Sequence, residues 1–381
     1  MNHFDIFQAQ YKAWSILSRS FKTGRVASTY LFHGSEGLGQ WLLAVSFAAL
    51  LNCSNPRKTD DNQHPFYPCG ECRNCRNIYG LNFIGLFAVA PIGPYKKLDE
   101  AIEMTNEFVE KKRQEPLGRL SALGSLMLPI DMARLVKKNL SLIPDEGTTR
   151  VAIFYRMDKM LASSADALLK LIEEPPSGAV IILTAERPEA LLPTIQSRAQ
   201  GIKMDRVPTE VIVDYLMKKY SQEKSKALLI ARISEGLPGY AVDMVAGEED
   251  DESSRRSVGL LLYKTLLTES PAAMILLMDE LIDFKNRSEV DNLLYLWQTL
   301  VRDCSYYAMT GDDQGLINID FVPEIIKLSR YFGPPRVTDG VTEAIKNTLA
   351  DLPLNVHIQM AMAALVLKIK RTIKSAPVSA G

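Results

Sequence analysis

At 381 residues, the chain is longer than one ordinary hydrophobic core supports, so two or three domains are expected. Hydrophobic residues make up 47% and charged residues 23% of the sequence, which are ordinary values for globular proteins and disfavour a disordered or fibrous chain. The 44 Lys and Arg residues nearly balance the 45 Asp and Glu residues, so the composition does not support tight DNA binding by the chain alone.

The sequence contains no apolar run of the roughly 18–20 residues that a membrane-spanning helix needs. Residues 1–14 lack a charged segment followed by an apolar stretch, and so do not resemble a signal peptide. We therefore expect a cytoplasmic protein without a membrane partner. Because cytosolic thiols stay reduced, the clustered cysteines of this chain favour a metal site over disulfides.

The first α/β signal is a short apolar strand followed by a glycine-rich turn and a helix. The strand is expected over residues 30–33, the turn contains Gly34, Gly37 and Gly39, and an Ala-rich helix covers residues 41–52. This is the frame of a P-loop, GxxxxGK[ST], in which backbone N–H groups at a helix N-terminus surround phosphate oxygens. The alternative is a chance glycine turn, which the position between a strand and a helix disfavours.

The two P-loop positions that carry the chemistry hold unsuitable residue types. Gln40 stands where a lysine contacts the β- and γ-phosphates, and charge-assisted hydrogen bonds are roughly twice as strong as neutral ones. Trp41 stands where a hydroxyl holds Mg²⁺, and an indole N–H cannot ligate a metal. We therefore expect no functional ATP or Mg²⁺ site and no intrinsic ATPase activity. The alternative is a divergent ATPase that still binds nucleotide through the glycines.

Four cysteines follow this helix in the pattern Cx15Cx2Cx2C, at Cys53, Cys69, Cys72 and Cys75. Zn²⁺ prefers four thiolates in a tetrahedron, and a Cx2C turn lets two sulfurs converge on one ion. Four protein ligands leave no open position for water or substrate, so we expect a structural zinc site in a lobe over about residues 53–78. A redox cysteine pair, unliganded thiols and an iron–sulfur cluster are the alternatives.

The next part of the chain contains a helical insertion and then returns to the α/β pattern. Residues 94–128 are charged and helical in period, which is unusual within a minimal α/β unit. Residues 151–155 and 179–183 are short, nearly all-apolar runs, typical of parallel strands that are covered on both faces. A helix is expected between them, over residues 163–174. The pattern predicts a doubly wound parallel sheet domain over residues 1–206.

A second nucleotide motif is also altered. P-loop hydrolases commonly end the strand opposite the loop in acidic residues, one of which supports Mg²⁺. Here the strand runs into Tyr155 and Arg156, and the nearest acid is Asp158. Because the two motifs are altered independently, both favour a site that does not hydrolyse ATP.

After residue 206 the strand signals disappear and the apolar spacing is helical. Residues 207–247 are expected to form a small helical domain, and the acidic run over residues 248–252 is expected to be a solvated linker. Residues 255–381 are helical in period and are expected to form a third domain. The predicted fold class is therefore α/β plus all-α, in three domains.

Together these features resemble the bacterial clamp-loader subunits of DNA polymerase III, which are AAA+ proteins. The resemblance rests on the P-loop frame, on the cysteine insertion directly after its helix, and on two further motifs, Asp166-Ala-Leu-Leu-Lys-Leu-Ile-Glu-Glu-Pro-Pro176 and Ser197-Arg198-Ala199 in place of the family's Ser-Arg-Cys. It implies an AAA+ domain with a zinc lobe, a helical lid over residues 207–247 and a C-terminal collar that builds a ring.

The departures from the family pattern imply the delta-prime type, which does not hydrolyse ATP. The implied partners are the gamma/tau motor subunits and delta, with the sliding clamp and primer-template DNA as further contacts within the complex. The resemblance also implies that Arg198, next to Ser197, acts in trans as an arginine finger on a neighbour's γ-phosphate. The alternatives are an intramolecular ion pair for Arg198, a gamma/tau-like ATPase for the chain, and a zinc-bearing nucleic-acid module.

Overall fold

The computed structural model describes residues 4–58, 66–119, 127–141, 147–159, 165–246, 249–333, 335–352 and 356–374. The chain divides into two compact units, one made of Met1–Ala227 with Ser234–Asp243 and the other of Leu228–Ile233 with Met244–Gly381. The division into three domains stays a prediction. Among the residues that the structure describes, none of the helices is long and apolar enough to cross a bilayer.

The first unit is built on a parallel sheet, whose strands in the described part of the chain are β1 (Thr29–His33), β4 (Leu86–Val89), β5 (Arg150–Phe154), β6 (Ala179–Ala185) and β7 (Gln200–Lys203). The strand order is β4-β5-β6-β1-β7. This order confirms the expected doubly wound α/β class. The strands β1, β5 and β6 lie where the sequence predicts them. The edge strands β4 and β7 were not predicted, because each is only four residues long and partly exposed.

The elements around this sheet are α1 (Ile6–Ala9), α2 (Tyr11–Lys22), α3 (Gln40–Leu51), β2 (Arg57–Lys58), β3 (Phe66–Tyr67), α4 (Arg73–Tyr79), α5 (Leu98–Gln114), α6 (Ile130–Leu140), α7 (Ala165–Glu173), α8 (Pro193–Gln196) and α9 (Thr209–Tyr220). Two further helices cross the division between the units, α10 (Lys224–Ile233) and α11 (Pro238–Ala246). The helices predicted at residues 41–52 and 163–174 are confirmed as α3 and, within the described residues, α7.

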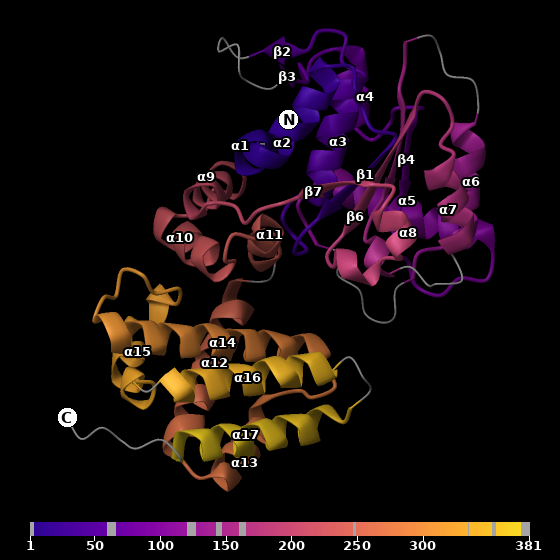
Figure 1. The fold of residues 1–381 in the computed structure, drawn as a ribbon. Helices are drawn as coiled ribbons and strands as arrows, with labels where there is room; N and C mark the ends of the chain where they lie inside the picture. Colours follow the sequence, from indigo (N-terminus) through magenta and orange to yellow (C-terminus); the bar gives the residue numbers. More distant parts are fainter. Residues whose placement is uncertain are drawn as a thin grey trace. The chain divides into compact units, whose positions relative to one another are not determined.

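Helices cover both faces of the sheet, as Figure 1 shows for α3 on one side and α6 and α7 on the other. On one face, Leu31 of β1 belongs to a core that also contains Val136 of α6 and Leu171 of α7. On the other face, the ring of Tyr30 lies 5.2 Å from the ring of Phe47 in α3. Because β1 is buried on both faces, the loop that follows it is held at the carboxyl edge of the sheet.

The insertion predicted at residues 94–128 contains the helix α5, and its helical character is confirmed there. Ile92 and Met127 form an isolated antiparallel bridge at its base, and residues 120–126 lie outside the described part. The inner face of α5 buries Ala101, Thr105, Phe108 and Lys112. These positions recur at helical spacing, so the helix packs one face inward although its outer face is acidic.

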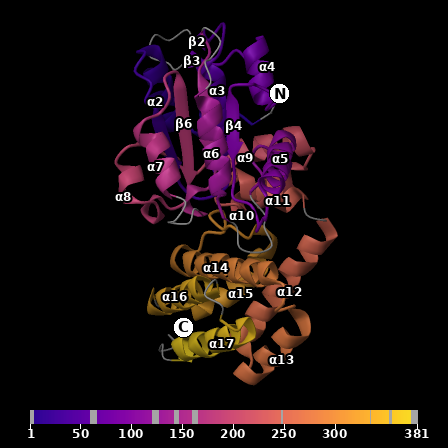
Figure 2. The same cartoon turned by 90° about the vertical axis from the view of Figure 1, so that its right-hand side faces the viewer.

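The second unit is helical, with α12 (Glu249–Thr268), α13 (Pro271–Leu281), α14 (Arg287–Thr310), α15 (Val322–Leu328), α16 (Pro335–Asp351) and α17 (Ile358–Lys374). Figures 1 and 2 both show α14, α16 and α17 side by side. Trp297 is fully buried in its core and its indole N–H donates to the carbonyl of Gly259, at 3.1 Å. The helical content predicted for residues 255–381 is confirmed over the described residues.

The acidic run near residue 250 is not the linker that the sequence predicts. The helix α12 begins at Glu249, so residues 249–252 lie in its first turn, while residue 248 is outside the described part. Charge density alone does not distinguish a linker from the start of a helix.

Candidate functional site

The glycines of the degenerate phosphate loop have positive φ values, and the loop is closed by the side chain of Gln40. Gly34, Gly37 and Gly39 have φ values of 145°, 93° and 92°, in the region that favours glycine. The side-chain amide of Gln40 donates to the carbonyl oxygen of Gly34, at 3.0 Å, and to that of Ser35, at 2.7 Å. Gln40 is buried, so these internal bonds use the donor that a lysine would present to phosphate.

The magnesium position is filled by an aromatic cluster. Trp41 is only 2% exposed, and its ring lies 5.2 Å from that of Phe108 in α5 and 6.2 Å from that of Tyr155 after β5. The rings of Phe108 and Tyr155 are 5.4 Å apart. The sequence identifies Trp41 as a residue that cannot hold a metal. It gives no signal that Phe108, from the insertion, completes an apolar cluster here.

A cation occupies the place after β5 where P-loop hydrolases commonly have acidic residues. Arg156 has a φ of 55° and its guanidinium pairs with Glu36 of the phosphate loop, with Asp158 at 2.9 Å and with Glu186 at 3.1 Å. Burial disfavours its charge, but these carboxylates outweigh burial and raise the pKa of Arg156. Burial likewise opposes ionisation of Asp158, yet Arg156 lowers the pKa of that carboxyl. The acid nearest the strand is therefore neutralised by a protein cation.

A second cation, which the sequence analysis did not single out, lies beside this cluster. Lys112 of α5 is 4% exposed; its ammonium lies 4.7 Å from the centroid of the Tyr155 ring and donates to the carbonyl oxygen of Gly118, at 2.6 Å. Burial lowers the pKa of Lys112 to about 8, although Glu36 and nearby carboxylates oppose this effect. A buried lysine in a helix of acidic and basic residues has no distinctive sequence pattern.

Arg198 and Ser197 lie at the surface after α8. The Arg198 guanidinium pairs with Glu173 at the end of α7, 3.1 Å away, and donates to the carbonyl oxygen of Thr194, also at 3.1 Å. Ser197 donates to the same carbonyl, at 3.1 Å. The Arg198 side chain remains 42% exposed, so it is accessible from outside the chain. The ion pair named as the alternative is present, and exposed pairs of this kind contribute only about 0–1 kcal/mol.

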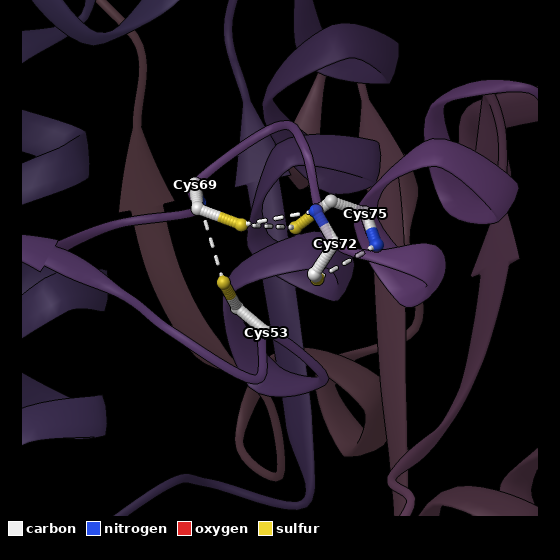
Figure 3. Close-up of side chains that lie close together, drawn as sticks. All are labelled: Cys53, Cys69, Cys72 and Cys75. Carbon is white, nitrogen blue, oxygen red and sulfur yellow. Dashed lines mark hydrogen bonds between the residues drawn. The ribbon is translucent and has the colours of Figure 1, made fainter.

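The four predicted cysteine ligands come together in one cluster. Cys53 follows α3, Cys69 and Cys72 lie in the turn before α4, and Cys75 is in α4; Figure 3 shows their side chains converging. All four Sγ atoms lie within 4.8 Å of one another, and those of Cys69 and Cys75 are 3.9 Å apart. Bonds of about 2.3 Å to a tetrahedral ion place sulfurs about 3.8 Å apart. The cluster therefore fits a four-coordinate metal ion.

Backbone donors support thiolates in this cluster. The N–H groups of Cys69, Cys72 and Cys75 point to the sulfurs of Cys53, Cys69 and Cys72, at 3.2, 3.3 and 3.4 Å. Gly70, with a φ of 75°, provides the turn that aims them. Burial opposes ionisation, but the N–H group of Cys75 and other donors lower the pKa of Cys72 to about 6. Burial raises the pKa of Cys75, whose thiolate needs the charge of a metal ion.

Comparison with known proteins gives consistent matches. The family described as DNA polymerase III, delta subunit, matches residues 9–208, slightly more than half of the chain. The DNA polymerase III subunit delta' of Bacillus subtilis is 25% identical over 368 residues, which cover 95% of this chain and 97% of that protein. The subunit delta' of Escherichia coli is 24% identical over 232 residues, 61% of this chain and 58% of that protein.

Two further matches are to proteins named as other subunits, tau and gamma. The DNA polymerase III subunit tau of Escherichia coli is 25% identical over 254 residues, which cover 65% of this chain and 33% of that protein. Among solved structures, a DNA polymerase III gamma subunit-related protein from Thermotoga maritima has 16% identity and a TM-score of 0.40, over 93% of this chain and 99% of that chain.

Proposed function

The chain belongs to the DNA polymerase III delta-subunit family, as a delta′ clamp-loader subunit related to gamma/tau, and we propose that it does not hydrolyse ATP but supplies Arg198 to a neighbouring subunit. The observation that carries this proposal is the content of its own phosphate site. Gln40 is bonded inward, Trp41 lies in an aromatic cluster, and Arg156 pairs with the acids nearby. Within the part of the chain that the structure describes, that site does not provide both an oxygen ligand for Mg²⁺ and a free cation for the γ-phosphate.

The position of Arg198 supports a role across a subunit boundary. The side chains of Arg198 and Glu173 are each about two-fifths exposed. Such a pair holds the guanidinium in place, but breaking it so that Arg198 can bind another group costs little free energy. A planar guanidinium binds phosphate oxygens bidentately and stays charged at every physiological pH. An arginine finger supplied in trans accelerates hydrolysis by about 10³–10⁵ in well-studied cases. The partners implied are gamma/tau and delta, with the sliding clamp and primer-template DNA within the assembled complex.

The test is a clamp loader reconstituted from this chain with gamma/tau and delta subunits. Arg198→Ala should lower DNA-stimulated ATPase activity at least about tenfold, because the finger role predicts loss of transition-state stabilisation. Glu173→Gln removes the intramolecular partner and should leave activity within about threefold, since exposed pairs contribute little. Arg134→Ala is the matched control, because Arg134 is another exposed arginine with a single carboxylate partner, Asp131.

The outcomes separate the finger role from a purely structural role. Equal assembly of all variants, checked by the mass of the complex, shows that the substitutions act on hydrolysis rather than on ring formation. Unchanged ATPase activity of the Arg198→Ala complex would rule out the finger.

We also propose that the four-cysteine cluster binds Zn²⁺ as a structural ion. Four sulfur ligands fill a tetrahedral shell and leave no position for substrate. Cys53 and Cys75 connect the end of α3 to α4, so the ion would hold the lobe to the helix that follows the phosphate loop. Apparent zinc binding of about 10–16 kcal/mol in small zinc modules is large enough to fold such a lobe.

A further inference from the structure

The segment that follows α5, residues 115–119, lies directly on the degenerate phosphate loop. A Cβ atom added to Gly39 would lie 3.3 Å from Cδ2 of Leu117, and one added to Gly37 would lie 3.4 Å from Cδ of Arg119. Leu117 is 2% exposed. Both loop glycines therefore face this segment in van der Waals contact, on the side where a Cβ atom would point.

The start of α11 closes the same space from another direction. The backbone N–H of Gly239 donates to the carbonyl oxygen of Gly37, at 2.9 Å. A Cβ on Gly239 would lie 2.5 Å from the carbonyl oxygen of Leu117 and 2.8 Å from Cα of Gly37. Three backbone segments thus meet at a point where only glycine fits. Their contact leaves no layer between them for a phosphate chain.

Both ends of residues 115–119 are anchored. The carboxylate of Glu115 accepts hydrogen bonds from Tyr215, at 3.2 Å, and from Lys219 and Tyr220, all in or next to α9. Arg119 pairs with Asp243 of α11 and its guanidinium lies 4.5 Å from the centroid of the Tyr240 ring, also in α11. The segment is consequently fixed to both helical neighbours of the phosphate loop, and is not a loose surface loop.

The charges around the segment are satisfied by protein groups. The ammonium of Lys112 donates to Gly118, and the guanidinium of Arg156 pairs with Glu36 within the loop itself. In a working P-loop, cations of this kind and the backbone donors would face phosphate oxygens. Here a nucleotide would have to displace Leu117 and Arg119. Among the described cations beside the loop, Arg119 and Arg156 are already ion-paired, and the ammonium of Lys112 is bonded to Gly118.

We propose that residues 115–119 form an internal plug that takes the place of the nucleotide and holds α11 against the phosphate loop. This inference rests on the proposed function, because it explains why a subunit that does not hydrolyse ATP keeps the glycines of a phosphate loop. It assigns a role to the end of the insertion, because the plug would hold the start of α11 against the α/β core without a bound ligand. Restoring the lysine of the motif is then insufficient to restore nucleotide binding.

The first test measures backbone hydrogen exchange in the full chain. Leu117→Ala and Arg119→Ala should each raise exchange of the amides in residues 34–41 at least about tenfold, because they loosen the plug, while exchange in α14 stays unchanged. Arg134→Ala is the matched control and should change neither region. Unchanged exchange of the phosphate loop in both plug variants would overturn the proposal.

The second test titrates Gln40→Lys with MgATP and avoids the buried Trp41, whose replacement endangers folding. The plug predicts no binding at 1 mM MgATP, on the order of a hundredfold above the affinity of an open, functional site. Micromolar binding by Gln40→Lys would overturn the plug and leave the role of Arg198 untouched. Conversely, normal ATPase activity in a loader carrying Arg198→Ala would refute the proposed function without changing the exchange result, so the two failures are distinguishable.

Discussion

Replacing Lys112 by Met should stabilise the first unit at neutral pH. The lysine is 4% exposed, and burial lowers its pKa from the usual 10.5 to about 8. At about 1.36 kcal/mol per pH unit, holding the ammonium in the fold costs on the order of 3 kcal/mol. The substitution also removes the hydrogen bond to Gly118, worth about 1 kcal/mol. The expected net gain at pH 7 is about 2 kcal/mol.

The sign of this effect depends on pH. Below pH 8 Lys112 is charged in both the folded and the unfolded chain, so the full penalty applies. Between pH 8 and 10.5 the folded chain releases the proton while the unfolded chain keeps it, and stability rises. Above pH 10.5 the group is neutral in both states and the penalty is gone. The advantage of Lys112→Met should therefore shrink from pH 8 upward and become a loss of about 1 kcal/mol near pH 10.5.

The assay is the urea dependence of hydrogen exchange in α3, which reports the free energy of unfolding of the first unit at pH 7, 9 and 10.5. Lys111→Met is the matched control, because Lys111 is an exposed neighbour in α5 whose replacement should change stability by less than about 0.5 kcal/mol. A loss of stability for Lys112→Met at pH 7 would refute the view that this cation is held in an unfavourable environment. A gain in stability that does not shrink as the pH rises from 7 to 10.5 would refute it as well.

Two further predictions concern the plug and the metal. Gly239→Ala should destabilise the first unit by about 1–3 kcal/mol, because its Cβ would lie 2.5 Å from the carbonyl oxygen of Leu117. Gly201→Ala, in β7 of the same unit, is the control in the same exchange assay, because its added Cβ would make an ordinary contact with Nε2 of His33, at 3.7 Å. Equal effects of the two substitutions would contradict the close packing at Gly239. Under the zinc proposal, a chelator should speed exchange in α4 and leave α14 and α17 unchanged, because the four cysteine ligands lie only in the lobe and at the end of α3. Measured metal loss without faster exchange in α4 would exclude a structural ion.

The sequence predicts those parts of the fold whose signals are local. The strands β1, β5 and β6 are apolar runs buried on both faces, and the helix α3 begins directly after Gly39. The cysteine spacing also predicts the cysteine cluster, because the turn at Gly70 brings Cys69, Cys72 and Cys75 together within a few residues. In each case the residues that make the feature, apart from Cys53, lie close in the chain.

The parts that escaped prediction depend on contacts between distant residues. Leu117 meets Gly39, and Arg156 meets Glu36, across 78 and 120 positions respectively. Nothing in the composition of residues 94–128 indicates that their end covers a phosphate loop, because a Leu and an Arg after a helix are common. Likewise, the partner of Arg198 became visible only when α7 and α8 were placed side by side.

The glycine pattern illustrates how one signal supports two interpretations. Gly34, Gly37 and Gly39 fit a phosphate loop, and their positive φ values agree with that frame. The same positions also suit a loop packed tightly against its neighbours, since a Cβ at Gly39 would lie 2.9 Å from Cδ1 of Ile6 and 3.3 Å from Cδ2 of Leu117. Gln40 and Trp41 favour a phosphate loop that has lost its chemistry, because they replace the cation and the magnesium ligand.

The most direct measurement of the central claim is ATP hydrolysis by the purified chain in the presence of Mg²⁺. We expect no turnover above the buffer background, because the phosphate site holds Trp41 in an apolar cluster and pairs Arg156 with its own acids. Sustained, Mg²⁺-dependent turnover that Gln40→Ala abolishes would contradict the account, since it would show that this pocket works by itself.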